Sequence, residues 1–357
     1  MNQVWDIRKE DPLVSVCVIT YNHAPYIRDC LDGVLSQKTD FPYEICIGED
    51  ESSDATREIC KEYAKKYPDK IRLFLRSRED VLIINGRATG RYNFLETLKS
   101  CRGKYVARCE GDDYWIDPRK LAKQVGFLEK NPAFSLCYCN VFIRHDKGLF
   151  SLCPGYSNNP FWSRKFGVGR VPENDLDALS LVHGNMLHTP GVVMRNSLTE
   201  EHFSSSLFRC SFMADWPMNL CALQQGLGKF MNEPMAVYRV HRGGIWSGCG
   251  MEERLVNTIW SAVAMLESPF FSQATKEGLR KGAACFFRRL WFMGESYSFD
   301  SMMILYRNIC ARLPELEPEI LREIRSVDSL EQKSFKRALV RVLKRMSGFV
   351  GQLGRKG

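Results

Sequence analysis

At 357 residues with 45% hydrophobic side chains, the chain is long enough to bury the core of one large domain with an appendage. The formal net charge of +8 arises at the C-terminal end, because removing the eight basic residues that follow Glu331 from the total of 50 leaves 42, the number of acidic residues. This balance excludes the spread basic surface that is typical of a nucleic-acid-binding protein. The 14 cysteines include no C-x-x-C pair, which excludes zinc-ribbon and thioredoxin-type sites.

The cysteines and the N-terminal segment predict where the protein resides. Cys17, Cys46 and Cys109 stand inside apolar runs, where a thiol serves as a small core residue, and this usage suits a reducing compartment. Residues 1–11 are polar and contain no apolar signal-peptide region. No apolar run is long enough to cross a bilayer. We therefore expect a soluble, cytoplasmic protein.

The first 110 residues alternate between strand and helix patterns. Apolar runs rich in β-branched residues predict strands at 14–20, 43–48, 71–75 and 104–109. Helical spacing of apolar residues predicts helices at 26–35, from about 54 onward and at 92–100, and Ser52 or Ser53 is the expected N-cap of the second. This alternation predicts a doubly wound α/β fold with a mostly parallel sheet.

Polar side chains follow three of these strands, at the edge where such sheets bind ligands. The first strand ends in T-Y-N at 20–22, the second in G-E-D-E at 48–51 and the fourth in E-G-D-D at 110–113. Carboxylates gathered at one edge repel each other unless a cation lies among them, and a divalent metal such as Mn²⁺ or Mg²⁺ prefers oxygen ligands. The alternative for the triplet at 49–51 is a solvated turn.

Two common phosphate-binding motifs are absent from the sequence. There is no G-x-x-x-x-G-K-[ST] loop, and no G-x-G-x-x-G follows the first strand. If the chain binds a nucleotide diphosphate, we expect a metal held by the acidic residues to neutralise it.

Several segments together carry a family resemblance. They are V-S-V-C-V-I-T-Y-N at 14–22, I-G-E-D-E-S-S-D-A-T at 47–56, G-K-Y-V-A-R-C-E-G-D-D-Y-W at 103–115, M-A-D-W-P-M at 213–218 and Y-R-V-H-R-G-G at 238–244. In this order, over about residues 12–250, they resemble the inverting family 2 glycosyltransferases of GT-A fold. The resemblance implies a hexosyl- or hexosaminyltransferase that moves a sugar from a nucleotide diphosphate donor, usually a UDP-sugar, to a glycan or lipid-linked glycan acceptor.

The resemblance also implies roles for donor-side residues. Thr20, Tyr21 and Asn22 would frame the nucleotide base, and Asp50 would hydrogen-bond it. In the D-x-D-like pair, Asp112 would lie toward the ribose or sugar. Asp113 would bind the metal.

On the acceptor side, the resemblance makes Asp215 the catalytic base and places His241 over the diphosphate as a further metal ligand. Many relatives have Glu-Asp at the base position, whereas Ala214 precedes Asp215 here. A helix cap at the start of residues 216–225 is the alternative for Asp215, and an ordinary loop residue is the alternative for His241.

Two other function classes share parts of this pattern. A nucleotidyltransferase that makes nucleotide sugars also uses acid clusters on a doubly wound sheet, but it normally has a glycine-rich basic loop after the first strand, and residues 20–25 (T-Y-N-H-A-P) form none. A non-catalytic nucleotide-sugar-binding protein of the same fold is the second alternative, because fold alone does not establish chemistry.

The sequence predicts two domains. We expect a GT-A domain over 1–250, with a donor half at about 12–130 and an acceptor half at about 131–250, and a helical extension over 251–357. Residues 333–350 form an amphipathic pattern with Lys336, Arg337, Arg341, Lys344 and Arg345 on one face. This is typical of a helix that binds an anionic membrane surface, here the inner face of the cytoplasmic membrane, and a helix packed on the domain is the alternative.

Overall fold

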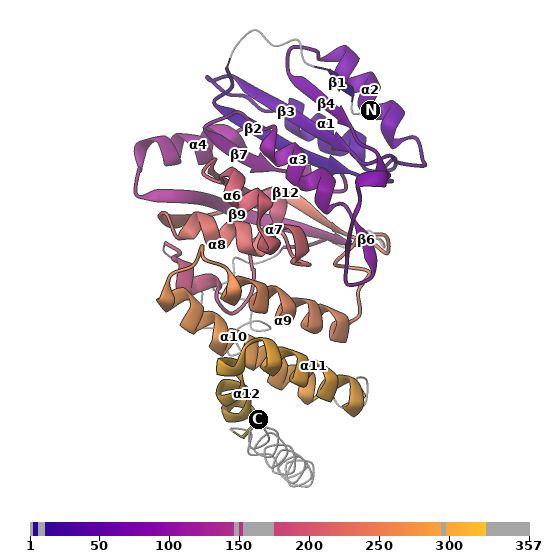
Figure 1. Ribbon diagram of the computed structural model, residues 1–357. Helices are drawn as coiled ribbons and strands as arrows, with labels where there is room; N and C mark the ends of the chain where they lie inside the picture. The colour runs from indigo at the N-terminus through magenta and orange to yellow at the C-terminus, as the bar shows by residue number, and fades with distance from the viewer. Residues whose placement is uncertain (1–2, 6–10, 146–149, 153–174, 294–297, 326–357) are drawn as a thin grey trace. The chain divides into compact units, whose positions relative to one another are not determined.

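The computed structural model describes residues 3–5, 11–145, 150–152, 175–293 and 298–325. The expected basic helix at 333–350 lies outside the described residues. The chain begins with strands and helices in alternation, and helices dominate after residue 250 (Figure 1).

The four predicted strands are present as β2, β3, β4 and β7, among further strands that the sequence did not predict. The bounds of the strands are β1 Gln3–Trp5, β2 Val14–Thr20, β3 Tyr43–Glu49, β4 Ile71–Leu75, β5 Leu82–Ile84, β6 Arg87–Thr89, β7 Tyr105–Arg108, β8 Tyr114–Trp115, β9 Phe134–His145, β10 Phe150–Leu152, β11 Val192–Arg195 and β12 Leu227–Val240.

The helices lie between and after them. The α-helices are α1 Ile27–Leu35, α2 Thr56–Lys66, α3 Arg91–Lys99, α4 Lys120–Lys130, α6 Glu200–Ser204, α7 Ser206–Cys210, α8 Asp215–Leu223, α9 Met251–Glu267, α10 Gln273–Trp291, α11 Phe299–Arg312 and α12 Glu317–Arg325. Short 3₁₀ helices are η1 Arg78–Asp80, η3 Ala178–Leu181, η4 Thr189–Gly191 and η5 Pro314–Leu316.

One large sheet organises the first part of the chain. Its strand order is β1-β4-β3-β2-β7-β11-β9-β12-β8, with β10 paired to β9. The strands β4, β3, β2 and β7 are parallel, as predicted, and β12 is parallel to β9. β11 runs antiparallel to both β7 and β9, and β8 runs antiparallel to β12. The carboxyl ends of β2, β3 and β7 therefore meet at one edge.

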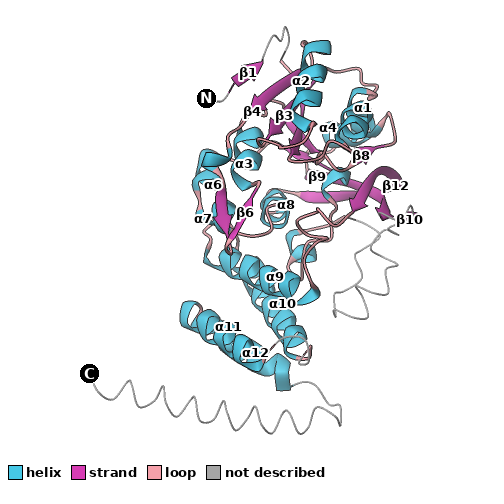
Figure 2. Cartoon of the chain, turned by 90° about the vertical axis from the view of Figure 1, so that its right-hand side faces the viewer, coloured by secondary structure: helices cyan, strands magenta, loops and turns pink. Residues whose placement is uncertain are grey.

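Helices cover both faces of this sheet (Figure 2). Val14, Val16 and Val18 of β2 face a core that includes apolar residues of α1, α2 and α4. The alternate residue Ser15 faces the other side, where its hydroxyl donates to Glu44 Oε1 at 2.6 Å. On that side α3 packs on β2 and β3, and Asn93 of α3 donates to the carbonyl of Gly48 at 2.8 Å. The β2 run is buried on both faces, as expected for a central parallel strand.

The chain divides into two compact units, residues 1–282 and residues 283–357, and α10 contains the division. In the described part of the second unit, the rings of Phe287 and Tyr306 lie 5.9 Å apart. The Tyr306 hydroxyl donates to Glu317 at 2.6 Å, which ties α11 to α12. The helical character that the sequence predicts after residue 250 is thus present in α9 to α12.

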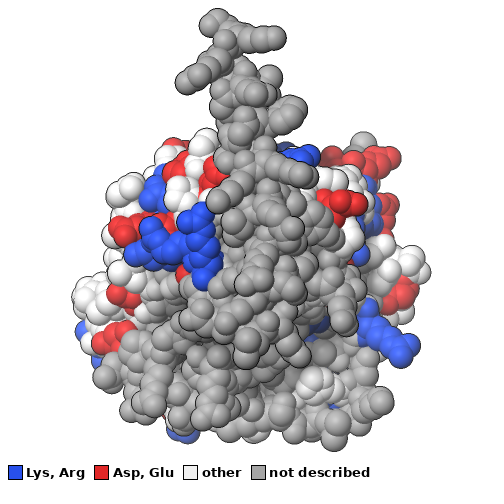
Figure 3. Space-filling model, turned by 90° about the horizontal axis from the view of Figure 1, so that it is seen from below, with Lys and Arg blue, Asp and Glu red and all other residues white. Residues whose placement is uncertain are grey.

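Among the described residues, no helix combines the length and the apolar composition needed to cross a membrane. On the face drawn in Figure 3, acidic and basic side chains of the described residues lie interspersed.

Candidate active site

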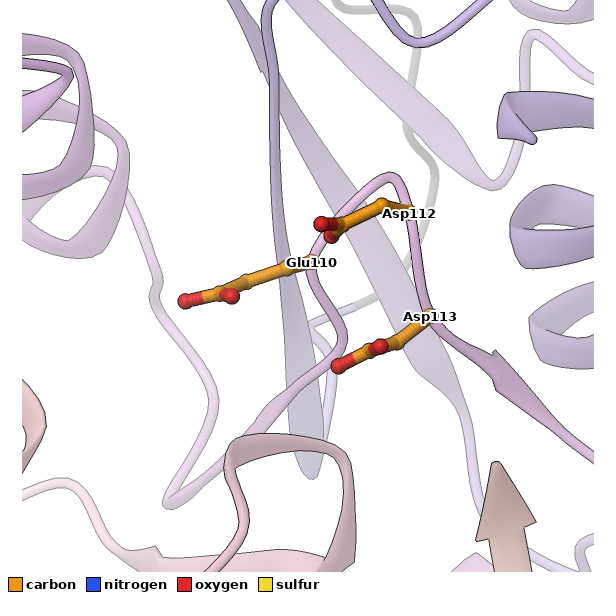
Figure 4. Close-up of side chains that lie close together, drawn as sticks. All are labelled: Glu110, Asp112 and Asp113. Carbon is orange, nitrogen blue, oxygen red and sulfur yellow. The ribbon is translucent and has the colours of Figure 1, made fainter. Parts of the chain in front are cut away.

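Three carboxylates gather in the turn between β7 and β8. Glu110, Asp112 and Asp113 each offer one carboxylate oxygen, and these oxygens lie within 4.8 Å of one another. The side chains leave a single short turn and point to the same side (Figure 4). In the described part of the chain, this triad is the group of acidic, histidine or cysteine side chains that has the spacing of a metal site.

The two aspartates of the triad are each held by one oxygen only. Asp113 is fully buried, and its Oδ1 accepts the backbone N–H of Arg239 in β12 at 2.8 Å. Asp112 Oδ2 lies 3.0 Å from His241 Nε2. Asp112 Oδ1 and Asp113 Oδ2 are buried and have no hydrogen-bond partner among the described residues. Buried carboxylate oxygens without partners are costly, and a bound cation would satisfy them.

The pKa values of the triad also favour a bound cation. Burial, together with the charges of Asp112 and Asp215, raises the pKa of Glu110 to about 8. Burial also raises the pKa of Asp113 well above its ordinary value, and the neighbouring charges of Asp112 and Glu110 add to this effect. The three groups resist carrying three negative charges together, and a divalent cation would remove that penalty.

A cluster of aromatic and basic side chains supports Asp112. The rings of Tyr26 and His241 lie 4.9 Å apart, and His23 Nε2 lies 4.0 Å from Asp112 Oδ2. Arg239 donates from Nη1 to the carbonyl of Asp112 at 2.8 Å. His241 lies beside the acidic turn, where its ring contacts Asp112, and it does not belong to the triad.

The end of β2 approaches the acidic turn closely. The N–H of Gly111 donates to the carbonyl of Ile19 at 2.9 Å. A Cβ atom at Gly111 would lie 2.6 Å from Thr20 Oγ1, so only glycine allows this approach. The Thr20 hydroxyl is buried and has no hydrogen-bond partner among the described residues. Thr20 thus offers a free polar group at the same edge as the triad.

Asp50 lies at the end of β3 and is paired with an arginine. Its side chain is 2% exposed, and Arg78 Nη1 donates to its Oδ2 at 2.6 Å. The same guanidinium lies 4.1 Å from the ring centre of Tyr21, which is 38% exposed. Burial raises the pKa of Asp50 to about 6, although the charge of Arg78 opposes that rise. Asp50 and Tyr21 are therefore brought together through Arg78.

Asn22 joins the loops after β2 and β3. It adopts a left-handed backbone conformation with φ of 54°, which asparagine tolerates better than most residues. Its N–H donates to Ser52 Oγ at 2.9 Å, and its Oδ1 accepts the N–H of Ser53 at 2.8 Å. The expectation that Ser52 or Ser53 caps α2 is wrong, because the residue before α2 is Ala55 and the N-terminal end of this helix has no side-chain cap. The serines bind Asn22 instead.

Asp215 is the first residue of α8. Its Oδ1 accepts the N–H of Trp216 at 3.0 Å, and its Oδ2 accepts a hydrogen bond from Asn185 Nδ2. Trp216 is fully buried and donates from its indole nitrogen to the carbonyl of Leu181 at 2.7 Å, which fixes the start of the helix. The capping alternative for Asp215 is wrong, because Ala214 is the residue before α8 and the start of the helix has no side-chain cap.

The triad and Asp215 belong to one electrostatic neighbourhood. After burial, the charges of Asp113, Glu110, Asp112 and Asp215 all raise the pKa of the Tyr238 phenol. The charge of Asp215 also raises the pKa of Glu110, so it acts on the triad directly as well as on Tyr238. The turn after β7, the start of α8 and the Tyr238 region of β12 therefore share one electrostatic neighbourhood.

Sequence reasoning finds the residues of this site only in part. The run E-G-D-D is the signal for Glu110, which the sequence places in the acidic cluster without a role of its own and which adds a third carboxylate to the predicted pair. Arg78 gives no such signal, because its pairing with Asp50 requires the fold. Arg91 is buried and donates to the carbonyls of Phe208 and Ser211.

Sheet order, helices on both faces and an acidic turn at the carboxyl end of β7 define an α/β protein of GT-A fold. The fold is also that of the S. aureus protein TarS, residues 1–349, in a crystal structure with UDP. The TM-score is 0.57 at 15% sequence identity, and the match covers 91% of each chain. TarS has also been crystallised with UDP-GlcNAc.

Residues 15–188 match the family model described as glycosyl transferase family 2, and the chain belongs to that family. An uncharacterized Mycobacterium tuberculosis protein, Rv1520, is 35% identical over 242 residues, which are 68% of this chain and 62% of that protein. The chain thus spans about three-fifths of the length of this relative. TuaG of Bacillus subtilis, named as a candidate teichuronic acid biosynthesis glycosyltransferase, is 36% identical over 126 residues, 35% of this chain and 45% of TuaG.

Proposed function

We propose that the protein transfers a sugar from a nucleotide diphosphate donor, a UDP-sugar, to a hydroxyl of a glycan or lipid-linked glycan, with inversion at the anomeric carbon. The observation that carries the proposal is the acidic triad with its two unpartnered buried oxygens, which lies in the same neighbourhood as Asp215. Family membership favours sugar transfer over the synthesis of nucleotide sugars.

On the donor side, the base would lie near Tyr21 and Asp50. The Tyr21 ring is exposed enough to stack on a base, and an ionised Asp50 would accept the N3–H of uracil. Thr20 has a free hydroxyl nearby, whereas Asn22 would shape this pocket through its two serine contacts. The UDP and UDP-GlcNAc complexes of TarS, which has the same fold, support this choice of donor.

The residues of the triad fit a divalent cation, Mn²⁺ or Mg²⁺. Asp113 would bind it through the free Oδ2, and Asp112 and Glu110 would contribute further oxygens. When bound, such a cation stabilises negative charge on the departing diphosphate. His241 would hold Asp112 in place and is a further candidate ligand.

Asp215 would act as the base. In an inverting transfer, the acceptor oxygen forms a bond to the anomeric carbon as the bond to the diphosphate oxygen breaks, and the acceptor proton passes to the base. Both Asp215 oxygens accept hydrogen bonds from neutral N–H groups, so the carboxylate has donors on the protein side and keeps lone pairs for an acceptor hydroxyl.

The proposal is tested by incubating the protein with a panel of nucleotide sugars and measuring nucleoside diphosphate release, with Mn²⁺ and with EDTA. Metal-dependent release from a UDP-sugar is the expected result. Release from no member of the panel, with or without a polysaccharide acceptor, would contradict the proposal.

We further propose that the protein works at the inner face of the cytoplasmic membrane. The basic residues after Glu331 carry the whole charge excess, and each Lys or Arg near an anionic leaflet contributes about 1 kcal/mol. The full chain should sediment with vesicles that contain anionic lipid, less so at high salt, and a chain that ends near 331 should not. Equal sedimentation of both would contradict the membrane role of 333–350.

We propose the same domain division as the sequence predicts, with a GT-A domain over 1–250 and a helical extension over 251–357. The acceptor would then be presented beside the membrane, where lipid-linked glycans are found. TuaG, which is named as a candidate glycosyltransferase of teichuronic acid biosynthesis, supports a glycan acceptor.

A further inference from the structure

A chain of hydrogen bonds runs from a buried arginine to Asp215. Arg108, in β7, is 2% exposed, and its Nη2 donates to Asn219 Oδ1 at 2.6 Å. Asn219, in α8, is fully buried and donates from Nδ2 to Asn185 Oδ1 at 3.1 Å. Asn185 in turn donates from Nδ2 to Asp215 Oδ2. The chain links three segments that are far apart in the sequence.

The direction of this chain is fixed by chemistry. A guanidinium has five donors and no acceptor, so the oxygen of Asn219 has to face Arg108. The nitrogen of Asn219 then faces Asn185, whose oxygen also accepts the N–H of Leu187 at 3.2 Å. Two donors on that oxygen orient the amide, and the nitrogen of Asn185 has to face Asp215. Neither asparagine side chain can turn over without placing two donors or two acceptors against each other.

The backbone also holds Asn185 in place. Gly184, the residue before it, has φ of 123°, a conformation that side-chain-bearing residues rarely adopt. Asn185 Nδ2 lies 3.3 Å from the carbonyl of Leu187, which closes a local turn. The loop before η4 therefore presents this amide to α8 at a defined position.

We propose that Arg108, Asn219 and Asn185 form a positioning relay that orients the carboxylate of Asp215 and presents only hydrogen-bond donors to it. This inference rests on the proposed role of Asp215 as the base. A base must accept a proton at a defined lone pair, and a donor fixed on Oδ2 sets the rotation of the carboxylate.

Substitution of Asn219 by Asp tests the direction of the relay. The new carboxylate still accepts from Arg108 and has nearly the same volume, but it has no donor for Asn185. The Asn185 amide is then expected to turn its nitrogen toward position 219 and its oxygen toward Asp215, where it would repel the ionised base. Asn185→Leu removes the amide altogether and serves as the second variant.

The experiment measures kcat and KM for nucleoside diphosphate release from the nucleotide sugar that the wild-type protein uses best, together with the Kd for UDP. For both variants we expect kcat to fall by about 10- to 100-fold. KM for the donor and the Kd for UDP should stay within about twofold of wild type, since the donor side is untouched. A purely structural role would instead disturb all three quantities together.

Asn196→Asp is the matched control. Asn196 follows β11, and its Nδ2 donates to the carbonyls of Cys101 and Gly103 at 3.1 and 3.0 Å. Its backbone N–H donates to the carbonyl of Lys104, which precedes β7, whereas Glu110 follows β7. This substitution removes comparable hydrogen bonds, and we expect kcat near the wild-type value.

The outcomes separate the relay from the proposed function. If the wild-type protein releases no nucleoside diphosphate, the proposed function fails and the relay fails with it. If the wild-type protein is active and both Asn219→Asp and Asn185→Leu keep its kcat, the relay alone is contradicted. A loss of kcat that is as large in Asn196→Asp would also contradict it.

Discussion

The acidic triad and Asp215 place carboxylates in one neighbourhood but surround them differently. In the triad, Asp112 and Asp113 each keep a buried oxygen without a partner in the described structure, and burial raises the pKa of Glu110 and Asp113. At Asp215, both oxygens accept hydrogen bonds from N–H groups. The first environment is electrostatically incomplete, whereas the second is complete without any added ion.

The difference shows how two carboxylate environments can serve one reaction. Unpartnered, crowded carboxylates gain free energy from a cation, so they suit the binding of a metal and of the diphosphate that the metal neutralises. A carboxylate that is held by neutral donors stays available as a proton acceptor. We therefore expect substitutions in the triad to act on donor binding and substitutions at Asp215 to act on turnover.

The largest effect is expected from Asp215→Asn. An amide cannot take the acceptor proton, so kcat should fall by about 10²- to 10⁴-fold while the Kd for UDP in Mn²⁺ stays unchanged. Steady-state kinetics and titration calorimetry measure the two quantities. Near-normal turnover of this variant would show that another group is the base, and it would remove the contrast between the two environments.

The placement of the polar residues after β2, β3 and β7 could be predicted from the sequence, because they lie in short segments directly after strands. The turn at 110–113 is one such segment, and its position after a buried strand was enough to predict an acidic cluster. The ordered parallel strands of the first half followed from alternating apolar runs in the same way.

The supporting contacts could not be predicted, because each joins residues that are distant in the sequence. Asn185 and Asp215 are 30 positions apart, and Arg108 and Asn219 are 111 apart. The antiparallel insertion of β11 between β7 and β9 was also missed, because local periodicity carries no information about strand order. Such contacts depend on the packing of α8 and β7.

The next effect in size concerns the metal and Asp113. Removal of Mn²⁺ by EDTA, or the substitution Asp113→Ala, should weaken UDP binding by about 10- to 100-fold, because the diphosphate charge then faces the remaining carboxylates. Titration calorimetry with UDP measures this effect. If UDP binding by Asp215→Asn still depends on the metal, the triad and Asp215 have separate roles. If UDP binds equally well in Mn²⁺ and in EDTA, and Asp113→Ala binds UDP as wild type does, the triad does not bind the metal and the proposed difference between the two environments is contradicted.

The smallest effect is expected at Asp50, a third carboxylate environment in which an arginine supplies the positive charge. Its pKa is raised to about 6, so Asp50 is ionised above that pH and protonated below it. Only the ionised form accepts the N3–H of uracil without first giving up a proton. Uridine, which has no phosphate to titrate in this range, should therefore bind about tenfold more weakly at pH 5 than at pH 7.

Two variants test whether Asp50 causes this pH dependence. Asp50→Asn should bind uridine weakly at both pH values, with no dependence on pH between them. Arg78→Met should shift the midpoint to higher pH, because the positive charge of Arg78 opposes the rise in the pKa of Asp50. Ligand-observed NMR with uridine measures these weak affinities. A pH profile that is the same in wild type and Asp50→Asn would show that the uracil ring binds elsewhere. The metal-dependent part of UDP binding would then have to be explained by the triad alone.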